Sequence, residues 1–149
     1  MNNNTFTFPK DFIWGTATSA HQTEGNNTHN DWWEWEHTPP KSGDSSPEPS
    51  DIACDSYNRY KEDFELAKSL NTNAIRISIE WSRIEPEEGK FDQKEIEHYQ
   101  KVLKAAQDEG LKTFVTLHHF TNPTWFSKKG GWMNLKSPEY FARYAKKCA

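Results

Sequence analysis

The stretch Asn73-Ala74-Ile75-Arg76-Ile77-Ser78-Ile79-Glu80-Trp81-Ser82-Arg83 decides the fold of this chain. Three isoleucines alternate with polar residues in it, which is the period-2 pattern of a β-strand. Helical patterns precede and follow it, so the expected product is a parallel sheet covered by helices. Because the isoleucine face packs against those helices, Arg76 and Glu80 are expected on the opposite face, inside whatever the sheet encloses.

Length and composition indicate one globular domain rich in large rings. The 149 residues are enough to enclose a core. Hydrophobic content is only 34%, mean hydropathy is −1.02, and aromatic content is 14% with seven Trp. The net charge is −4, with basic and acidic residues interspersed. A chain without a basic stripe to neutralise phosphates is not expected to bind nucleic acid.

The sequence also bounds the compartment and the cofactors. No apolar run approaches the roughly 20 residues of a membrane span, and Met1–Thr5 lacks the regions of a signal peptide. We therefore expect a cytoplasmic protein with no membrane partner. In that reducing compartment, Cys54 and Cys148 are expected to be free thiols, since they lie far apart in the sequence. No cofactor or metal is expected.

The N-terminal third predicts one strand, one long loop and one helix. Residues Phe12–Ala20 are expected to form a buried first strand, and its small residues let another surface come close. A long irregular loop is expected over residues 26–52, with three tryptophans in it. Apolar residues then recur every three or four positions from Tyr57 to Leu70, which predicts an amphipathic helix.

Two helices and one strand follow the central strand and complete three β-α units. Asp92, with Glu95 three residues on, predicts the start of a second helix that Gly110 ends. A third strand is expected over Lys112–His119. A third helix is expected to begin at Ser137-Pro138-Glu139, with Ser137 as the capping residue.

Polar side chains are expected to gather where the strands end, because ligands bind at the carboxyl ends of parallel strands. Polar groups beside aromatic rings suit a sugar, whose hydroxyls need hydrogen-bond partners and whose C–H faces pack on rings. The residues concerned, in chain order, are Gln22, Glu24, Glu80, Trp81, His118 and His119.

Each of these groups also has a structural interpretation. At most one of the adjacent histidines can face a site, because neighbours on a strand point to opposite faces. Glu24 and Glu80 could form the carboxylate pair of a glycosidase, or they could bond loop backbone or a nearby arginine. The tryptophans at 32, 33 and 35 could pack the loop or form a sugar platform.

Arg76 is the most informative residue. A guanidinium on the inner face of a central strand is costly to bury unless an acid accompanies it. Glu80 is four residues along, roughly 13 Å in an extended strand. The acid is therefore expected on another strand, either in a structural ion pair or in a functional site.

Four segments together resemble a known family. Residues Phe12–Gly25, Ala53–Asp63, Arg76–Pro86 and Thr116–Phe120 match, in order and spacing, the N-terminal part of family 1 glycoside hydrolases of the β-glucosidase and β-galactosidase type. The resemblance covers nearly the whole chain. It implies an α/β fold of the (β/α)8 TIM-barrel family, with residues 1–149 as a single partial barrel domain of about three β-α units, truncated within the third helix.

The resemblance also implies roles for individual residues. Gln22 and His119 would bond the hydroxyls of the glycone, and Arg76 would hold the carboxylate of the catalytic nucleophile. Phe120 stands where many members have Trp, which removes an indole donor to the sugar. His21 stands where Tyr is frequent, so the precise glycone stays open.

The implied activity is retaining hydrolysis of β-glucosides or β-galactosides. That reaction needs an acid/base Glu and a nucleophilic Glu whose carboxyl groups lie roughly 5 Å apart. Neither the Asn-Glu-Pro nor the Glu-Asn-Gly type motif that carries them in the family is present here. We therefore expect the chain by itself to be inactive towards its β-glycoside substrate unless it is completed.

Two other interpretations stay open. The chain could be a non-catalytic carbohydrate-binding or half-barrel module that associates with itself or with a separate C-terminal barrel portion, because three β-α units leave two sheet edges unpaired. It could also be the product of a truncated reading frame with no function of its own.

Overall fold

The computed structural model describes residues 6–41, 45 and 47–149. The residues Met1–Thr5, on which the expectation of no signal peptide rests, lie outside the described part. Among the described residues no helix is long and apolar enough to cross a membrane.

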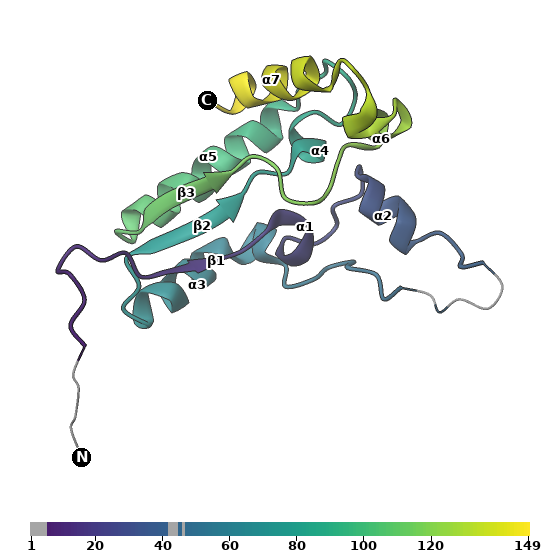
Figure 1. The fold of residues 1–149 in the computed structure, drawn as a ribbon. Coiled ribbons are helices and arrows are strands. Elements are labelled where there is room, and N and C mark those ends of the chain that lie inside the picture. Colours follow the sequence, from purple (N-terminus) through teal and green to yellow (C-terminus); the bar gives the residue numbers. More distant parts are fainter. Residues whose placement is uncertain (1–5, 42–44, 46) are drawn as a thin grey trace.

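Three parallel strands form the sheet in the order β1 (Gly15–Ala17), β2 (Ala74–Ser78) and β3 (Lys112–Thr116). Helices α3 (Ser56–Ser69) and α5 (Gln93–Asp108) lie together on one side of it, and no helix of the described ranges covers the other side (Figure 1). The shorter elements are α1 (Ala20–Thr23), α2 (Asp31–Glu36), α4 (Trp81–Ile84), α6 (Thr124–Lys128), the 3-10 turn η1 (Gly131–Met133) and α7 (Ser137–Cys148).

The isoleucine face of β2 builds the first core, as the period-2 pattern predicts. Ile75 and Ile77 are 2% and 5% exposed. Burying each such side chain contributes about 1.5–3 kcal/mol. Their buried partners from the two covering helices and the turn after α5 are Phe64, Ala67, Val102, Ala106 and Leu111.

A second core joins α4 to the C-terminal helices. Trp81 is 1% exposed, its ring stacks on Tyr144 with centroids 5.1 Å apart, and its indole N–H donates to the Glu85 carboxylate. The expectation that Trp81 ends the second strand beside a ligand is therefore wrong. Because Glu80 caps α4, the chain turns into a helix at Trp81, and that turn carries the indole into the core.

The helix boundaries follow local signals in most places. Asp92 caps α5 through hydrogen bonds from the backbone N–H groups of Lys94 and Glu95, and Gly110 follows the helix with φ of +73°. Ser137 is not the cap of α7, because its hydroxyl donates to the carbonyls of the preceding turn. Leu70, expected on the apolar face of α3, lies past the helix end and is 70% exposed.

The first strand is shorter and more exposed than the sequence predicts. Only Gly15–Ala17 pairs with β2, where a Cβ on Gly15 would lie 3.0 Å from the Ala74 carbonyl oxygen. Phe12 and Trp14, expected to be buried, are 38% and 48% exposed. Their rings pack on each other and on Phe8 instead. The physical reason is that β1 is an edge strand, with no described element on its other side.

The segment 26–52 is not wholly irregular. Asp31–Glu36 forms α2, capped by the Asn30 side chain, which accepts from the N–H of Trp33. The third strand ends at Thr116, and residues 117–119 continue from it without pairing. On this other edge strand, Phe114 and Val115 are 49% and 40% exposed.

Candidate functional site

Arg76 lies in the middle of β2, on the sheet face opposite the isoleucines. Its register partners are Ala17 on β1 and Phe114 on β3, so these three side chains share one level of the open face. The guanidinium is exposed, and within the described part of the chain it forms no ion pair within 4.0 Å. The expected orientation is confirmed, and the group is free to meet an acid.

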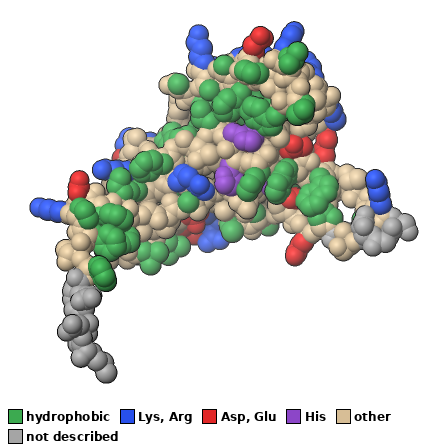
Figure 2. Space-filling view, in the orientation of Figure 1, with side chains coloured by type: hydrophobic (Ala, Val, Ile, Leu, Met, Phe, Trp, Pro, Cys, Tyr) green, Lys and Arg blue, Asp and Glu red, His purple; other side chains and the backbone are tan. Residues whose placement is uncertain are grey.

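The two histidines after β3 have different surroundings. His118 bonds the Asn122 side chain at 3.1 Å and packs edge-on against Trp132. Burial, together with the positive charges of Arg76 and His118, lowers the pKa of His119, and its ring packs against Phe120. Thus one histidine is structural and the other belongs to the open face. Figure 2 shows histidine side chains exposed next to a Lys or Arg side chain in the middle of the visible face.

Gln22 is exposed on the short helix α1, and Ser19 donates its hydroxyl proton to the Gln22 side chain. The preceding residue, His21, is 5% exposed and bonds Glu36 of α2 at 2.9 Å. Asn30 Nδ2 lies 3.1 Å from the other ring nitrogen of His21. The turn that carries Gln22 is therefore tied to α2.

Two stacked aromatic rings, those of Trp32 and Phe120, lie at one side of the site. Phe120, 54% exposed, stacks on Trp32 of α2 with ring centroids 5.4 Å apart, and its other neighbour is the ring of His119 at 4.4 Å. Trp32 is itself 36% exposed. Trp32 thus stacks on Phe120, whereas Trp33 stacks on His37.

Glu24 and Glu80 do not form a catalytic carboxylate pair. Both side chains are buried, and each is engaged by the protein. Glu24 accepts from Arg83 Nε at 2.9 Å and from the Tyr99 hydroxyl at 2.8 Å. Glu80 accepts from Ser82 and Thr121. The structural interpretation, bonding to loops and a nearby arginine, is the one that the structure supports.

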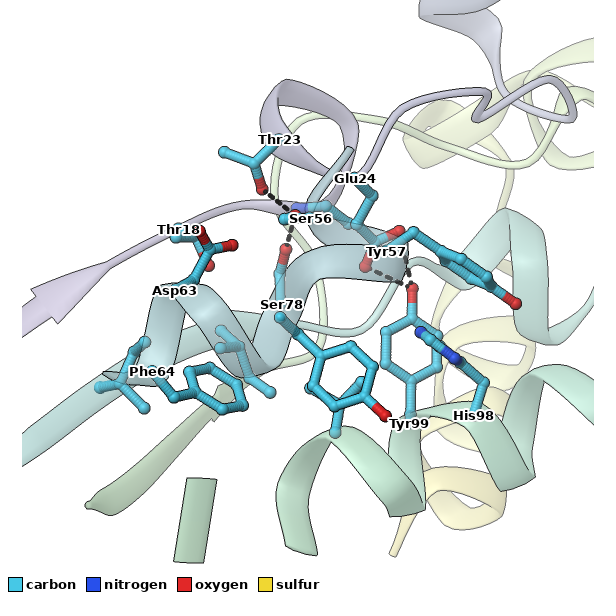
Figure 3. Close-up of a pocket in the computed structure, with 15 residues that line it drawn as sticks. Thr18, Thr23, Glu24, Ser56, Tyr57, Asp63, Phe64, Ser78, His98 and Tyr99 are labelled. Atoms are coloured by element: carbon cyan, nitrogen blue, oxygen red, sulfur yellow. Dashed lines mark hydrogen bonds between the residues drawn. The ribbon is translucent and has the colours of Figure 1, made fainter. Parts of the chain in front are cut away.

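The buried groups around Glu24 lie on the helix side of the sheet. Figure 3 shows the Tyr99 hydroxyl directed at the Glu24 carboxyl group, next to Tyr57 and His98. Burial raises the pKa of Glu24 to about 7. The cavity here is about 30 Å³, room for a water molecule, and far below the roughly 300–1,000 Å³ of a ligand pocket. This cavity is therefore too small to hold a sugar.

The candidate site thus has one cation, two uncharged hydrogen-bonding groups and two rings on an open surface. Gln22 and His119 can donate to and accept from hydroxyls, and the Trp32 and Phe120 faces suit C–H groups. No group of three or more metal-ligating side chains occurs in the described ranges, and the two cysteines there are free. Asn27, Tyr99 and Thr121 hold the site from behind, and no local pattern in the sequence points to them.

Known proteins resemble the chain over most of its length. The model of the family described as glycosyl hydrolase family 1 matches residues 4–149. Beta-glucosidase A of Acetivibrio thermocellus is 39% identical over 147 residues, covering 93% of this chain and 32% of that protein. The 6-phospho-beta-galactosidase of Clostridium acetobutylicum is 37% identical over 151 residues, covering 99% of this chain and 30% of that protein.

Solved structures agree. The crystal structure of beta-glycosidase BGL167 superposes with a TM-score of 0.89 at 48% identity, covering 95% of this chain and 33% of that chain. The beta-glycosidase from Pyrococcus horikoshii superposes with a TM-score of 0.83 at 42% identity, covering 94% of this chain and 32% of that chain. The chain spans about a third of the length of these relatives. The expected fold, the first three units of a (β/α)8 barrel, is confirmed.

Proposed function

This chain belongs to glycosyl hydrolase family 1, and we propose that it supplies the glycone-binding part of a retaining β-glycosidase. Gln22 and His119 bond the sugar hydroxyls, and Phe120 packs on the sugar ring. Arg76 positions the carboxylate of a nucleophile that the rest of a complete barrel contributes. The substrate class is β-glucosides or β-galactosides.

One observation supports this proposal above the others. Arg76 is exposed at the centre of the sheet, carries no counter-ion in the described structure, and has His119 close enough to feel its charge. Arg76 therefore makes no ion pair that would stabilise the described chain. An acid brought to this place would be bonded and oriented by the guanidinium.

The 149 residues alone bind a β-glycoside without hydrolysing it, because the two buried carboxylates that follow strands, Glu24 and Glu80, are occupied by Arg83, Tyr99, Ser82 and Thr121. General acid catalysis and nucleophilic attack both need a carboxyl group within reach of the glycosidic bond. Incubation with an aryl β-glucoside tests this point. Retaining hydrolysis by the chain alone would contradict it.

The full proposal is tested with a chimera that joins this chain to the C-terminal two-thirds of the Acetivibrio thermocellus relative. We expect the chimera to release the aryl group from an aryl β-glucoside, and Arg76→Met to abolish that release. Lys112→Met is the matched control, since Lys112 is a cation at the amino end of β3. Equal activity of the two variants would contradict the role of Arg76.

The exposed sheet edges favour a second candidate function. In it the chain associates as a half-barrel, either with itself or with a separate C-terminal barrel portion. Phe114 and Val115 are on opposite faces of β3 and are both largely exposed. Strands that are apolar on both faces are typical of the middle of a parallel sheet. Sedimentation should show self-association or poor compaction, and a compact monomer would argue against this candidate.

A further inference from the structure

A single buried carboxylate connects the segments that follow all three strands. Glu80, 3% exposed, comes two residues after β2. Its Oε1 accepts from the Ser82 hydroxyl at 2.7 Å and from the Ser82 N–H at 3.3 Å, which caps α4. Its Oε2 accepts from the Thr121 hydroxyl at 2.8 Å and from Asn27 Nδ2 at 3.4 Å. Thr121 follows β3, and Asn27 follows β1 and α1.

Glu80 has no cationic partner within 4.0 Å in the described part of the chain. Burial raises its pKa, and the hydrogen bonds from Ser82 and Thr121 act in the opposite direction. A buried carboxylate of this kind is poor evidence for added stability, because desolvation offsets the bonds that it accepts. What the four bonds do provide is geometry, since they fix three chain segments at one point.

The segment after β3 contains a residue that needs such fixing. Phe120 has φ of +67°, a left-handed conformation that is sterically unfavourable for a residue with a side chain. Strain of this sort persists only where neighbouring contacts impose it. Those contacts follow Phe120 directly. Thr121 donates its hydroxyl proton to Glu80, and Asn122 donates from its N–H and its Nδ2 to Asp31 Oδ1 and Oδ2, at 2.9 Å each.

We propose that Glu80 is a positioning residue, which acts through Thr121 to hold His119 and Phe120 in the orientation that faces Arg76 and Trp32. That these residues contact a sugar rests on the proposed function, whereas the positioning itself does not. Thr121 is 3% exposed, so its hydroxyl has no access to bulk water as an alternative partner. Losing the Glu80 bond would leave the segment around Phe120 held through Asn122, which bonds Asp31, His118 and Trp132.

The test compares two ways of removing one hydrogen bond from the same carboxylate. Thr121→Val preserves the shape of the side chain and removes the bond to Oε2. Ser82→Ala removes the hydroxyl bond to Oε1, on the side of α4. Both variants should lose similar stability to urea. Only Thr121→Val should shift the NMR signals of the His119 and Phe120 rings and the Trp32 indole.

Histidine titration gives a second readout. The pKa of His119 is held low by burial and by Arg76, so Thr121→Val should return it towards its ordinary value. Thr121→Ser, which keeps the hydroxyl, should restore the unmodified signals and titration. If Thr121→Val does not fold, Thr121→Ala replaces it. Unmoved ring signals in the folded variant, or equal shifts in Ser82→Ala, would overturn the proposal.

A sugar titration separates this inference from the proposed function. Methyl β-glucoside, added to the unmodified chain, should shift the same ring signals, and Thr121→Val should bind it about fivefold more weakly, the loss expected for one hydrogen bond. If the unmodified chain does not bind the sugar but Thr121→Val moves the rings, the positioning role stands and the proposed function fails. If the sugar binds equally tightly to the unmodified chain and to Thr121→Val, and the ring signals of the two proteins are the same, the positioning role fails.

Discussion

The ring of Trp32 lies parallel to the ring of Phe120, with centroids 5.4 Å apart and an angle of 13° between the planes. The two residues come from α2 and from the segment after β3. Asp31, next to Trp32, bonds the N–H and side chain of Asn122, two residues past Phe120. The stack is thus anchored through its neighbours, and it presents one continuous aromatic surface beside His119.

Trp32→Ala should disrupt that surface. Because stacked aromatic pairs contribute about 0.5–1.5 kcal/mol beyond burial, we expect a loss of about 1 kcal/mol in the free energy of unfolding. The NMR signals of the Phe120 ring should shift as well. Trp35→Ala is the matched control, since Trp35 is 61% exposed and meets Trp32 only edge-on. Unchanged Phe120 signals in Trp32→Ala would show that the stack does not order this ring.

Glu24 should make stability depend on pH. Burial raises its pKa from 4.5 to about 7, although Arg83 and Tyr99 act to lower it. Since the folded chain holds this proton more tightly than the unfolded chain, the stabilisation is complete below pH 4.5 and is lost as pH rises through 7. The loss relative to Glu24→Gln should be on the order of 3 kcal/mol.

Urea unfolding of the unmodified chain and of Glu24→Gln, from pH 4.5 to pH 8, checks this prediction. The difference between the two free energies isolates Glu24 from the other titrating groups. Glu65→Gln, on the solvent-exposed side of α3, serves as the control and should give no such trend. Parallel curves for Glu24→Gln and the unmodified chain would mean that Arg83 and Tyr99 fully offset the burial of the carboxyl group.

Ala53→Gly should stabilise the chain. Ala53 has φ of +47°, between Asp51 and Asp55, which are also left-handed. Glycine adopts this conformation without the steric cost, so the free energy of unfolding should rise by about 0.5–1 kcal/mol. The same change at Ala142, exposed in α7, should lower it by about 1 kcal/mol. Thermal unfolding of both variants would reveal the opposite signs, and destabilisation at position 53 would contradict the assigned backbone conformation.

Arg76→Met in the 149-residue chain should leave folding unchanged or improve it slightly. The guanidinium is exposed and has no ion-pair partner within the described residues, so the change should stay within about 0.5 kcal/mol. Urea denaturation measures it. A marked loss of stability would mean that Arg76 has a local partner, and the residue would then be a structural cation and not one reserved for an absent acid.

Local signals predicted the framework well. The period-2 pattern around Ile75 and Ile77, the cap at Asp92 and the stop at Gly110 depend on residues a few positions apart, and each is found in the structure. The exposure of Phe12 and Trp14 could not be predicted, because burial at an edge strand depends on whether another element covers it. The helical turn at Trp81 was missed because its cap is the Glu80 side chain, which the sequence also allowed to face a ligand.

In the candidate site, too, some features follow from the sequence and others only from the tertiary structure. By itself the sequence determined the sheet, the place of Arg76 on its open face and, through the motifs carrying Gln22 and His119, the family. Only the tertiary structure decided which histidine stands beside Arg76, that Trp32 stacks on Phe120, and that Glu80 joins Asn27 and Thr121. The physical reason is separation along the chain: periodicity and capping act over a few residues, whereas these contacts form only after the three strands have brought their ends together.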